Sequence, residues 1–217
     1  MAETATERAH AYTKERILDG RFAGGEILSE GDVAREIHLS RTPVREAFLQ
    51  LEAEGLLRLY PRRGALVIPV SAREVEQVME IRRLIETYAV EQVVVRRIDC
   101  APELEGLLAE QRTLADAGDG AGFVEADRRF HRLIVAATGN VLLTEFHDSL
   151  RDRQSRMGLA ALARDRGRVE QILGEHERIV ALVRGLDAGA AKDAMTAHLN
   201  RTLELLRTAP VGGFASD

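Results

Sequence analysis

Three histidines and one aspartate have the residue types and the spacing that can bind a transition metal. Asp127 and His131 are four residues apart in the segment DRRFH, so a helix would place both on one face. His176 in GEHERI and His198 in TAHLN lie in two later segments with helical patterns. Three imidazoles with one carboxylate suit Zn²⁺, Ni²⁺ or Mn²⁺ and leave coordination positions open for water or a ligand. These four residues are the candidate ligands of a divalent metal.

Each of these histidines also has a simpler interpretation. A lone histidine in a helical bundle more often has a core or surface role, and the Asp127–His131 pair is by itself weak evidence for a metal. His147 is interpreted as such a structural residue. The same four ligands would also suit metal-assisted hydrolysis, so a metal-dependent enzyme is an alternative function. The sequence links no separate general acid or base to the site, which favours ligand sensing.

A second chemical feature is a pair of arginines in SRTPVREA, at residues 40–47. Arg41 and Arg45 are one helical turn apart, where like charges repel by about 0.2–0.5 kcal/mol. An external anion would relieve this repulsion. Arginine can donate two hydrogen bonds to O6 and N7 of guanine, and the hydroxyl or methyl group of Thr42 can contact phosphate or thymine. The segment is therefore a candidate for reading DNA bases.

A basic turn, PRRG, follows this segment and extends the candidate DNA-binding set. Its arginines are candidates for contacts with the DNA backbone or the minor groove, and its glycine allows a tight turn and a close approach. The added residues are Arg62, Arg63 and Gly64. The alternative is a solvated arginine face that pairs with nearby carboxylates, namely Glu46, Glu52 and Glu54.

The composition limits the class of protein. The chain has 217 residues, of which 45% are hydrophobic and 30% are charged, and this is ordinary for a globular protein. A single cysteine, Cys100, excludes an intramolecular disulfide and a multi-cysteine metal site, which fits a reducing cytoplasm. No apolar run approaches the roughly 18 residues of a membrane span, so no membrane partner is expected. The net charge of −5 argues mildly against nucleic acid, so a DNA-binding interpretation depends on the local arginine cluster.

The elements that must position these residues follow from hydrophobic periodicity. In the first 70 residues the pattern predicts helices over 5–19, from Ser29 or Glu30 to about residue 37, and from Ser40 or Thr42 to Gly55. A glycine-rich turn and a short extended piece join the first two helices. Two apolar runs, 56–60 and 65–70, flank PRRG as a β-hairpin. Residues 1–70 are therefore predicted to form a winged helix-turn-helix domain.

Residues 71–217 have helical patterns throughout and no strand signal. The six predicted helices cover 71–97, 99–118, 121–138, 140–163, 168–186 and 189–207. The tail from 209 to 217 is predicted to be disordered. The fold class is thus mainly α, with the N-terminal winged helix-turn-helix followed by a C-terminal antiparallel six-helix bundle.

The first domain resembles a known family. The segment LSRTPVREAFLQLEAEGLLRLYPRRGALV is similar to the DNA-binding domain of GntR-family transcription regulators, and the resemblance spans about residues 5–70. It implies that operator DNA is contacted by Arg41, Thr42, Arg45, Arg63 and Gly64. The chain departs from some relatives at Gly31, where they place an arginine early in the second helix. Arg35 is then only a candidate phosphate contact.

The second domain resembles the FCD effector-binding domain of the FadR subgroup, over about residues 71–207. The resemblance rests on EADRRFHRLIVAATGN and EHERIVALVRGLDAGAAKDAMTAHL, and six helices are typical of the VanR-type branch. It implies that Asp127, His131, His176 and His198 are the metal-binding set. It also implies a small carboxylate effector, such as a sugar acid or an organic acid. Arg82 or Arg83 is the candidate cation for that carboxylate.

Together these features predict a cytoplasmic regulator of transcription, of the repressor type, and not an enzyme. A homodimer would read the two halves of a palindromic double-stranded operator, because the symmetry of the operator mirrors that of the protein. Effector binding in the bundle would change DNA binding. A third interpretation is an architectural DNA-binding protein whose bundle only dimerises.

Overall fold

A computed structural model describes residues 3–162 and 167–207 of the chain. They form two compact units, and the division falls between Ser71 and Ala72. The tail predicted to be disordered lies outside the described residues. No helix within the described ranges is both long and apolar enough to cross a membrane.

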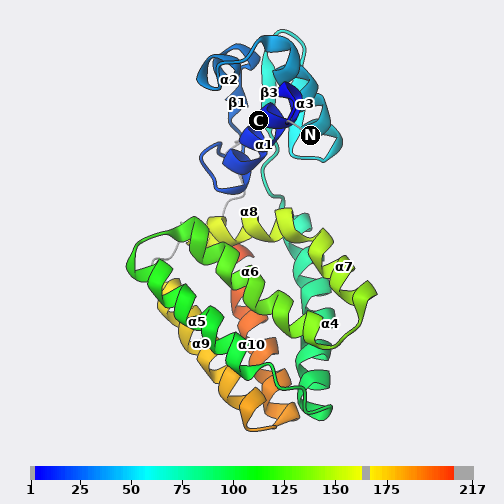
Figure 1. The fold of residues 1–217 in the computed structure, drawn as a ribbon, viewed down its shortest axis with the longest axis vertical. Helices are drawn as coiled ribbons and strands as arrows, with labels where there is room; N and C mark the ends of the chain where they lie inside the picture. The colour runs from blue at the N-terminus through cyan, green and yellow to red at the C-terminus, as the bar shows by residue number, and fades with distance from the viewer. Residues whose placement is uncertain (1–2, 163–166, 208–217) are drawn as a thin grey trace. The chain divides into compact units, whose positions relative to one another are not determined.

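The first unit contains three helices and a small antiparallel sheet. The helices are α1 (Ala5–Leu18), α2 (Glu30–Glu36) and α3 (Arg41–Ala53), and the strands are β1 (Ile27–Leu28), β2 (Leu57–Tyr60) and β3 (Gly64–Val67). The strand order is β1-β3-β2. The extended piece before α2 is therefore β1, and it pairs with β3, the second strand of the hairpin. Tyr60 pairs with Gly64 at the hairpin end and Leu57 with Val67 at its base. The predicted winged helix-turn-helix is confirmed (Figure 1).

The core of the first unit comes from the apolar positions that the periodicity indicates. On α3, residues at i, i+3, i+4 and i+7 are buried, and these are Val44, Ala47, Phe48 and Leu51. Ser29 caps α2 by accepting a hydrogen bond from the amide of Asp32. Because these four residues of α3 pack into the core, most other positions on this helix face solvent.

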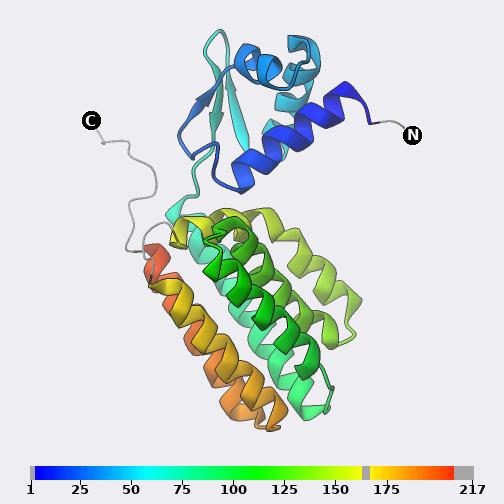
Figure 2. The same ribbon diagram turned by 60° about the vertical axis from the view of Figure 1, so that its left-hand side comes forward.

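The second unit is a helical bundle with seven helices among its described residues, so the predicted number of six is wrong. They are α4 (Ala72–Val95), α5 (Ala101–Asp116), α6 (Gly120–Ala137), α7 (Val141–Ser149), α8 (Arg151–Leu162), α9 (Arg168–Arg184) and α10 (Ala188–Arg207). Helices α5, α6, α9 and α10 run along the length of the unit, whereas α8 crosses one end of it (Figure 1 and Figure 2).

The extra helix arises because the predicted helix over 140–163 breaks at Leu150. The amide of Leu150 bonds to the carbonyl of His147, three residues back, and its own carbonyl accepts from Gln154, the first bond of α8. Leu150 is also buried. Neither glycine nor proline marks this position, so the break has no such local sequence signal.

Candidate functional site

The first candidate site is a groove in the first unit, between α3 and the hairpin tip. Its lining includes five of the six residues predicted to bind DNA: Arg41, Arg45, Arg62, Arg63 and Gly64. All four arginines are exposed. Thr42, the sixth residue, is exposed at the start of α3 but is not among the residues that line the groove. The structure therefore brings two sequence segments, about 20 residues apart, to one basic surface.

The three carboxylates that the sequence offered as partners of these arginines each bond to another group, although Glu52 lines the groove together with Glu30. Glu46 accepts a hydrogen bond from the hydroxyl of Thr6 at 2.7 Å, and Glu52 accepts the backbone amide of Leu59 at 2.7 Å. Glu54 lies 2.8 Å from the Lys14 ammonium. Within the described part of the chain, the structure shows no ion pair for the four groove arginines. An internally paired arginine face is therefore not what the structure contains.

Gly31 has a defined role in this groove. A β-carbon at this position would lie 3.2 Å from Nη2 of Arg41 and 3.3 Å from its Nε. The Arg41 guanidinium thus lies over the first turn of α2, in the space that a larger residue at position 31 would enter. Arg35, in contrast, is paired with Asp32 at 3.0 Å.

The second candidate site lies inside the second unit, where three helices meet. Asp127 and His131 come from α6, His176 from α9 and His198 from α10, and one potential ligand atom from each lies within 4.8 Å of the others. All three imidazoles are buried, and Asp127 is partly buried. Helical spacing placed the first two on one face. The packing of α9 and α10 against the bundle brings the other two to it.

The donor atoms of this cluster are those that a metal would need. Nε2 of His176 lies 3.6 Å from Oδ1 of Asp127, and Nε2 of His131 lies 3.9 Å from Oδ2, which is too far for hydrogen bonds. Among the described residues, neither Nε2 atom nor Oδ1 of Asp127 has a hydrogen-bond partner. An unsatisfied buried polar group costs about 1–3 kcal/mol, and one cation would satisfy all three. The residues present therefore fit a divalent metal.

A second layer of side chains orients the three imidazoles. Nδ1 of His176 lies 2.9 Å from Oε1 of Gln111 and Nδ1 of His198 lies 2.5 Å from Oε2 of Glu175, both with hydrogen-bond geometry. Nδ1 of His131 lies 2.7 Å from Oε2 of Glu86 as an ion-pair contact without hydrogen-bond geometry. An oxygen beside Nδ1 favours the tautomer with its proton there, and Nε2 then keeps its lone pair for a metal. Phe130 also stacks on the His176 ring at a centroid distance of 4.0 Å.

Burial favours the neutral form, which binds metals, for two of the imidazoles, His176 and His198. It lowers the pKa of His176 well below the usual value, and the neighbouring histidines add to the effect. Burial also lowers the pKa of His198, while the hydrogen bond to Glu175 opposes the shift. For Glu175 itself, burial alone would raise the pKa, but hydrogen bonds from His198 and Arg168 lower it to about 2.

Glu86 is the most deeply buried charge of this layer. Its side chain is fully buried, and it lies 2.7 Å from Nε of Arg82 and 3.2 Å from Nε2 of His147. Burial alone would raise the pKa of Glu86, but the charge of Arg82 and the contact with His131 hold that pKa well below its usual range. His147, interpreted from the sequence as structural, is buried against this carboxylate and is not part of the four-residue cluster.

A cavity adjoins the cluster and shares two of its residues, Asp127 and His198. Arg82 also lines the cavity, whereas Arg83 is exposed and lines a separate hollow with Glu80 and Arg207. Of the two candidate arginines, the structure therefore brings only Arg82 to the cavity beside the four-residue cluster. Sequence reasoning missed Arg168, a buried arginine that lines the same cavity and lies 2.9 Å from Glu175.

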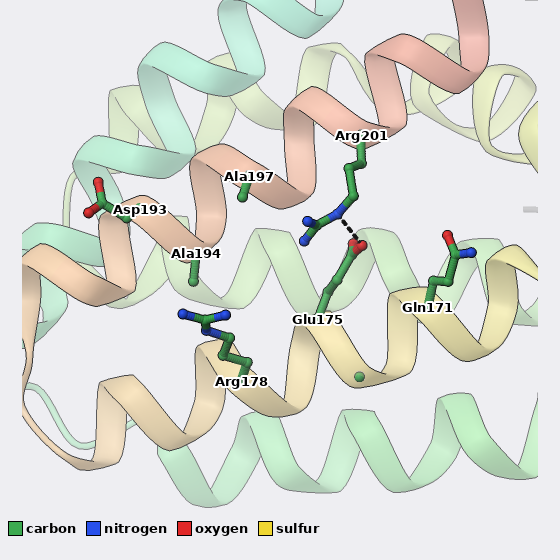
Figure 3. A pocket seen from close by; sticks show the side chains of 8 residues that line it. Gln171, Glu175, Arg178, Asp193, Ala194, Ala197 and Arg201 are labelled. Atoms are coloured by element: carbon green, nitrogen blue, oxygen red, sulfur yellow. Dashed lines mark hydrogen bonds and ion pairs between the residues drawn. The ribbon is translucent and has the colours of Figure 1, made fainter.

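A wider and more open hollow lies between α9 and α10 (Figure 3). Glu175 and Arg201 both line it, and Nε of Arg201 donates to Oε1 of Glu175 at 2.6 Å. The carboxylate of Glu175 thus accepts from a buried candidate ligand, His198, and from a half-exposed arginine, Arg201. Sequence reasoning also missed the second-layer residues Glu86, Gln111 and Glu175. Glu86 could have been found from the sequence, because it is a charged residue within the apolar stripe of α4.

Two family models match the chain. The model of the bacterial regulatory proteins of the gntR family matches residues 5–67, and the model of the FCD domain matches residues 77–201. The first match contains the basic groove, and the second contains all four candidate metal ligands.

Known relatives agree with these matches. The chain is 30% identical to the HTH-type transcriptional regulator YdhC of Bacillus subtilis, over 89% of this chain and 87% of that protein. It is also 30% identical to the gluconate operon transcriptional repressor of Bacillus subtilis, over 86% of this chain and 79% of the repressor. A GntR regulator structure from Rhodococcus sp. RHA1 has the same fold, with a TM-score of 0.77 and 22% identity over 94% of this chain and 98% of that one. The chain is therefore a member of the GntR family of bacterial transcription regulators, with an FCD domain as its second unit.

Proposed function

We propose that this protein is a ligand-responsive repressor, which binds a palindromic operator as a homodimer and senses a small carboxylate at a metal-containing pocket. The observation that carries this proposal is the cavity beside the four-residue cluster, which holds both potential metal ligands and buried arginines. Both curated relatives described above are named as transcription regulators, which supports a regulator over a metal-dependent enzyme. The protein would act on DNA in the cytoplasm.

Operator DNA is the proposed partner of the basic groove. Arg41 and Arg45 lie at the N-terminal end of α3, which is the part of a recognition helix that reaches base edges in the major groove. Arg62 and Arg63 at the hairpin tip suit contacts with phosphates. Because these arginines have no ion pair with any of the residues that the structure describes, phosphate charge would supply the missing compensation.

A small carboxylate is the proposed ligand of the cavity, because the cavity wall carries hydrogen-bond donors without acceptors. Among the described residues, Nε of Arg168 and Nε2 of Gln154 have no hydrogen-bond partner. Nη1 of Arg82 has only the sulfur of Met79 at 4.0 Å, which is a weak acceptor. A carboxylate could accept from these groups and also complete the coordination of a metal. The word gluconate in one relative's name is compatible with a sugar acid.

The cavity is small in this conformation. Its volume is about 40 Å³, far below the roughly 300–1,000 Å³ that is typical of pockets for small molecules. Helix α8 supplies much of one wall, including Met157 and Gly158. We therefore propose that a larger carboxylate enters when α8 shifts, which would be the ligand-induced change.

A second copy of the chain is the proposed partner of an apolar surface on α4 and α7, two helices in contact. This surface carries six exposed large hydrophobic side chains: Leu84, Tyr88, Val95, Val141, Leu142 and Phe146. On α4 these positions recur at intervals that keep them on one helical face. Exposed apolar patches of this kind mark interfaces, and a two-fold dimer would match a palindromic operator.

The proposal is tested with purified protein, elemental analysis and a DNA-shift assay on its own promoter region, with and without D-gluconate and other sugar or organic acids. The wild type is expected to contain a divalent metal and to release DNA with one of these acids. His176→Ala and His198→Ala should lose the metal and the response but still bind DNA, since neither residue belongs to the first unit. His10→Ala, whose imidazole pairs with Glu54 in the first unit, is the matched control and should retain the metal. A full response from the double His176→Ala/His198→Ala variant would contradict the proposed mechanism.

A further inference from the structure

Two rows of contacting side chains link the cavity to the four-residue cluster, and each consists of an arginine, a glutamate and a histidine. In the first, Nε of Arg82 donates to Oε1 of Glu86 at 2.7 Å, and Oε2 of Glu86 lies 2.7 Å from Nδ1 of His131. In the second, Nη1 of Arg168 donates to Oε1 of Glu175 at 2.9 Å, and Oε2 of Glu175 lies 2.5 Å from Nδ1 of His198. Both arginines line the same cavity.

We propose that these rows couple the two binding events, so that an anion in the cavity raises the affinity of the four-residue cluster for its metal. This inference rests on the proposed function, because it assumes that the cavity takes a carboxylate and the cluster takes a divalent metal. Coupling between sites is reciprocal, so the metal would raise the affinity for the anion by the same factor. A regulator built this way responds to the carboxylate only when its metal is available.

The physical basis is a carboxylate whose negative charge is shared between a cation and an imidazole. A carboxylate beside Nδ1 makes Nε2 a stronger donor to a metal. The paired guanidinium opposes this effect, because it attracts the same charge. An anion that binds the free N–H groups of the arginine neutralises part of its charge, and the glutamate then acts more strongly on the histidine. Burial of all three members of the first row keeps water from screening these interactions.

The third imidazole has no such link. Nδ1 of His176 meets the side-chain oxygen of Gln111, a neutral amide, and within the described ranges no arginine forms a hydrogen bond with either residue. The coupling is therefore assigned to His131 and His198. The first row is the sharper test, because Glu86 is fully buried, whereas Glu175 also pairs with the half-exposed Arg201.

The experiment measures the dissociation constant of Ni²⁺ by competition with a chelator, in acetate and in chloride at equal ionic strength. Acetate is the probe because it is the smallest carboxylate with a methyl group and the cavity is small. In the wild type, acetate should tighten Ni²⁺ binding by about 5-fold or more, the lower end of typical coupling between sites. Arg82→Gln should bind Ni²⁺ at least as tightly as the wild type in chloride and should lose most of the acetate effect. Arg83→Gln, at the exposed neighbouring position, is the matched control and should behave as the wild type.

The contact between Glu86 and His131 is tested with Glu86→Gln. This variant should bind Ni²⁺ about 10–100-fold more weakly, as expected for loss of a second-layer partner, and should also lose part of the acetate effect. Glu91→Gln is its control on the same helix, since Glu91 pairs with Lys192 away from the cluster. Circular dichroism shows whether each variant is folded, and if Glu86→Gln is not folded, Arg82→Gln decides alone.

The outcomes separate this inference from the proposed function. An equal acetate effect in the wild type, Arg82→Gln and Glu86→Gln means that acetate coordinates the metal directly, which overturns the coupling and leaves the metal-containing pocket in place. Weaker Ni²⁺ binding by Arg82→Gln in chloride also overturns it, because a purely structural arginine would give that result. If the wild type binds no Ni²⁺, Zn²⁺ or Mn²⁺, both the coupling and the metal-containing pocket of the proposed function are overturned.

Discussion

Gly64 of β3 and Leu28 of β1 approach so closely that a β-carbon on Gly64 would overlap the carbonyl oxygen of Leu28. Gly64 also has a φ of +101°, in the region that favours glycine. The sequence suggested Gly64 as part of a DNA-contacting turn. The structure gives this glycine a second role, since the lack of a side chain allows β1 to pair with β3 of the hairpin.

We expect Gly64→Ala to destabilise the first unit more than Gly55→Ala does. Both positions have positive φ, but a β-carbon at Gly55 meets no atom within 4 Å. The left-handed backbone alone costs alanine about 1–2 kcal/mol, and the clash at Gly64 adds roughly 1–3 kcal/mol. Thermal and urea unfolding followed by circular dichroism measure the difference. Equal losses in the two variants would show that β1 does not lie against Gly64.

A second glycine pair tests how α8 packs on α6. A β-carbon at Gly158 of α8 would lie 2.7 Å from Cγ1 of Val124, a stiff β-branched side chain. Gly158→Ala should therefore lower the free energy of unfolding by about 1–3 kcal/mol. Gly174→Ala on α9 meets no atom within 4 Å and should raise it by roughly 0.5–1 kcal/mol, since alanine is the better helix former. Opposite signs in urea denaturation are the expected result, and a stabilised Gly158→Ala variant would contradict this packing.

Base reading by α3 is tested through the groove arginines. Arg45→Ala should weaken binding to the specific operator by roughly 1–3 kcal/mol and relax the preference at one base pair in each half-site. Arg62→Ala should weaken binding to all sequences more evenly, as expected for a phosphate contact. Arg21→Ala, outside the groove and paired with Glu15, is the control. Fluorescence anisotropy with specific and random duplexes measures both effects. The assignment of Arg45 fails if the Arg45→Ala variant loses equal affinity for the specific operator and for the random duplex.

The apolar surface on α4 and α7 predicts a change of oligomeric state. A charge placed at Leu84 or Phe146, both at least half exposed in a single chain, would be buried in the proposed dimer at high cost. The double variant Leu84→Glu/Phe146→Glu should therefore sediment as a monomer at concentrations where the wild type is a dimer. Leu186→Glu changes a comparably exposed leucine in the loop before α10 and should remain dimeric. A dimeric double variant would place the interface elsewhere.

The single cysteine predicts a pH dependence. Burial raises the pKa of the Cys100 thiol to about 11, whereas a free thiol in an unfolded chain has a pKa near 8.5. The native thiol should therefore react with iodoacetamide far more slowly at pH 8 than the thiol of the urea-unfolded chain. Above pH 8.5 the unfolded chain loses this proton first, so the contribution of Cys100 to stability is lost progressively as the pH rises toward 11. Fast labelling of the native protein, followed by mass spectrometry, would show that Cys100 is not buried.

Much of the first unit could be predicted from the sequence because its signals are local. The stripe of Val44, Ala47, Phe48 and Leu51 depends only on helical periodicity, and it leaves Arg41 exposed whatever the rest of the chain does. Ser29 precedes α2 as a capping residue, and PRRG lies between two apolar runs. In each case a few neighbouring residues were sufficient.

The candidate metal ligands were also accessible from the sequence, but for a different reason. Asp127 and His131 share a face through their spacing alone. His176 and His198 were candidates by residue type, and the resemblance to a family strengthened their grouping with the pair, since no local rule relates residues on separate helices. Their meeting within 4.8 Å is a property of the folded bundle.

The tertiary structure alone decided the rest. The helix break at Leu150, a buried position, has no glycine or proline signal in the sequence. The choice between Arg82 and Arg83 depended on which side of α4 faces the cavity. The partners of Glu86 come from its own helix, from α6 and from α7. Local periodicity can predict that a charge lies in an apolar stripe, but it cannot identify the charges that meet it, because those are brought there by the packing of distant segments.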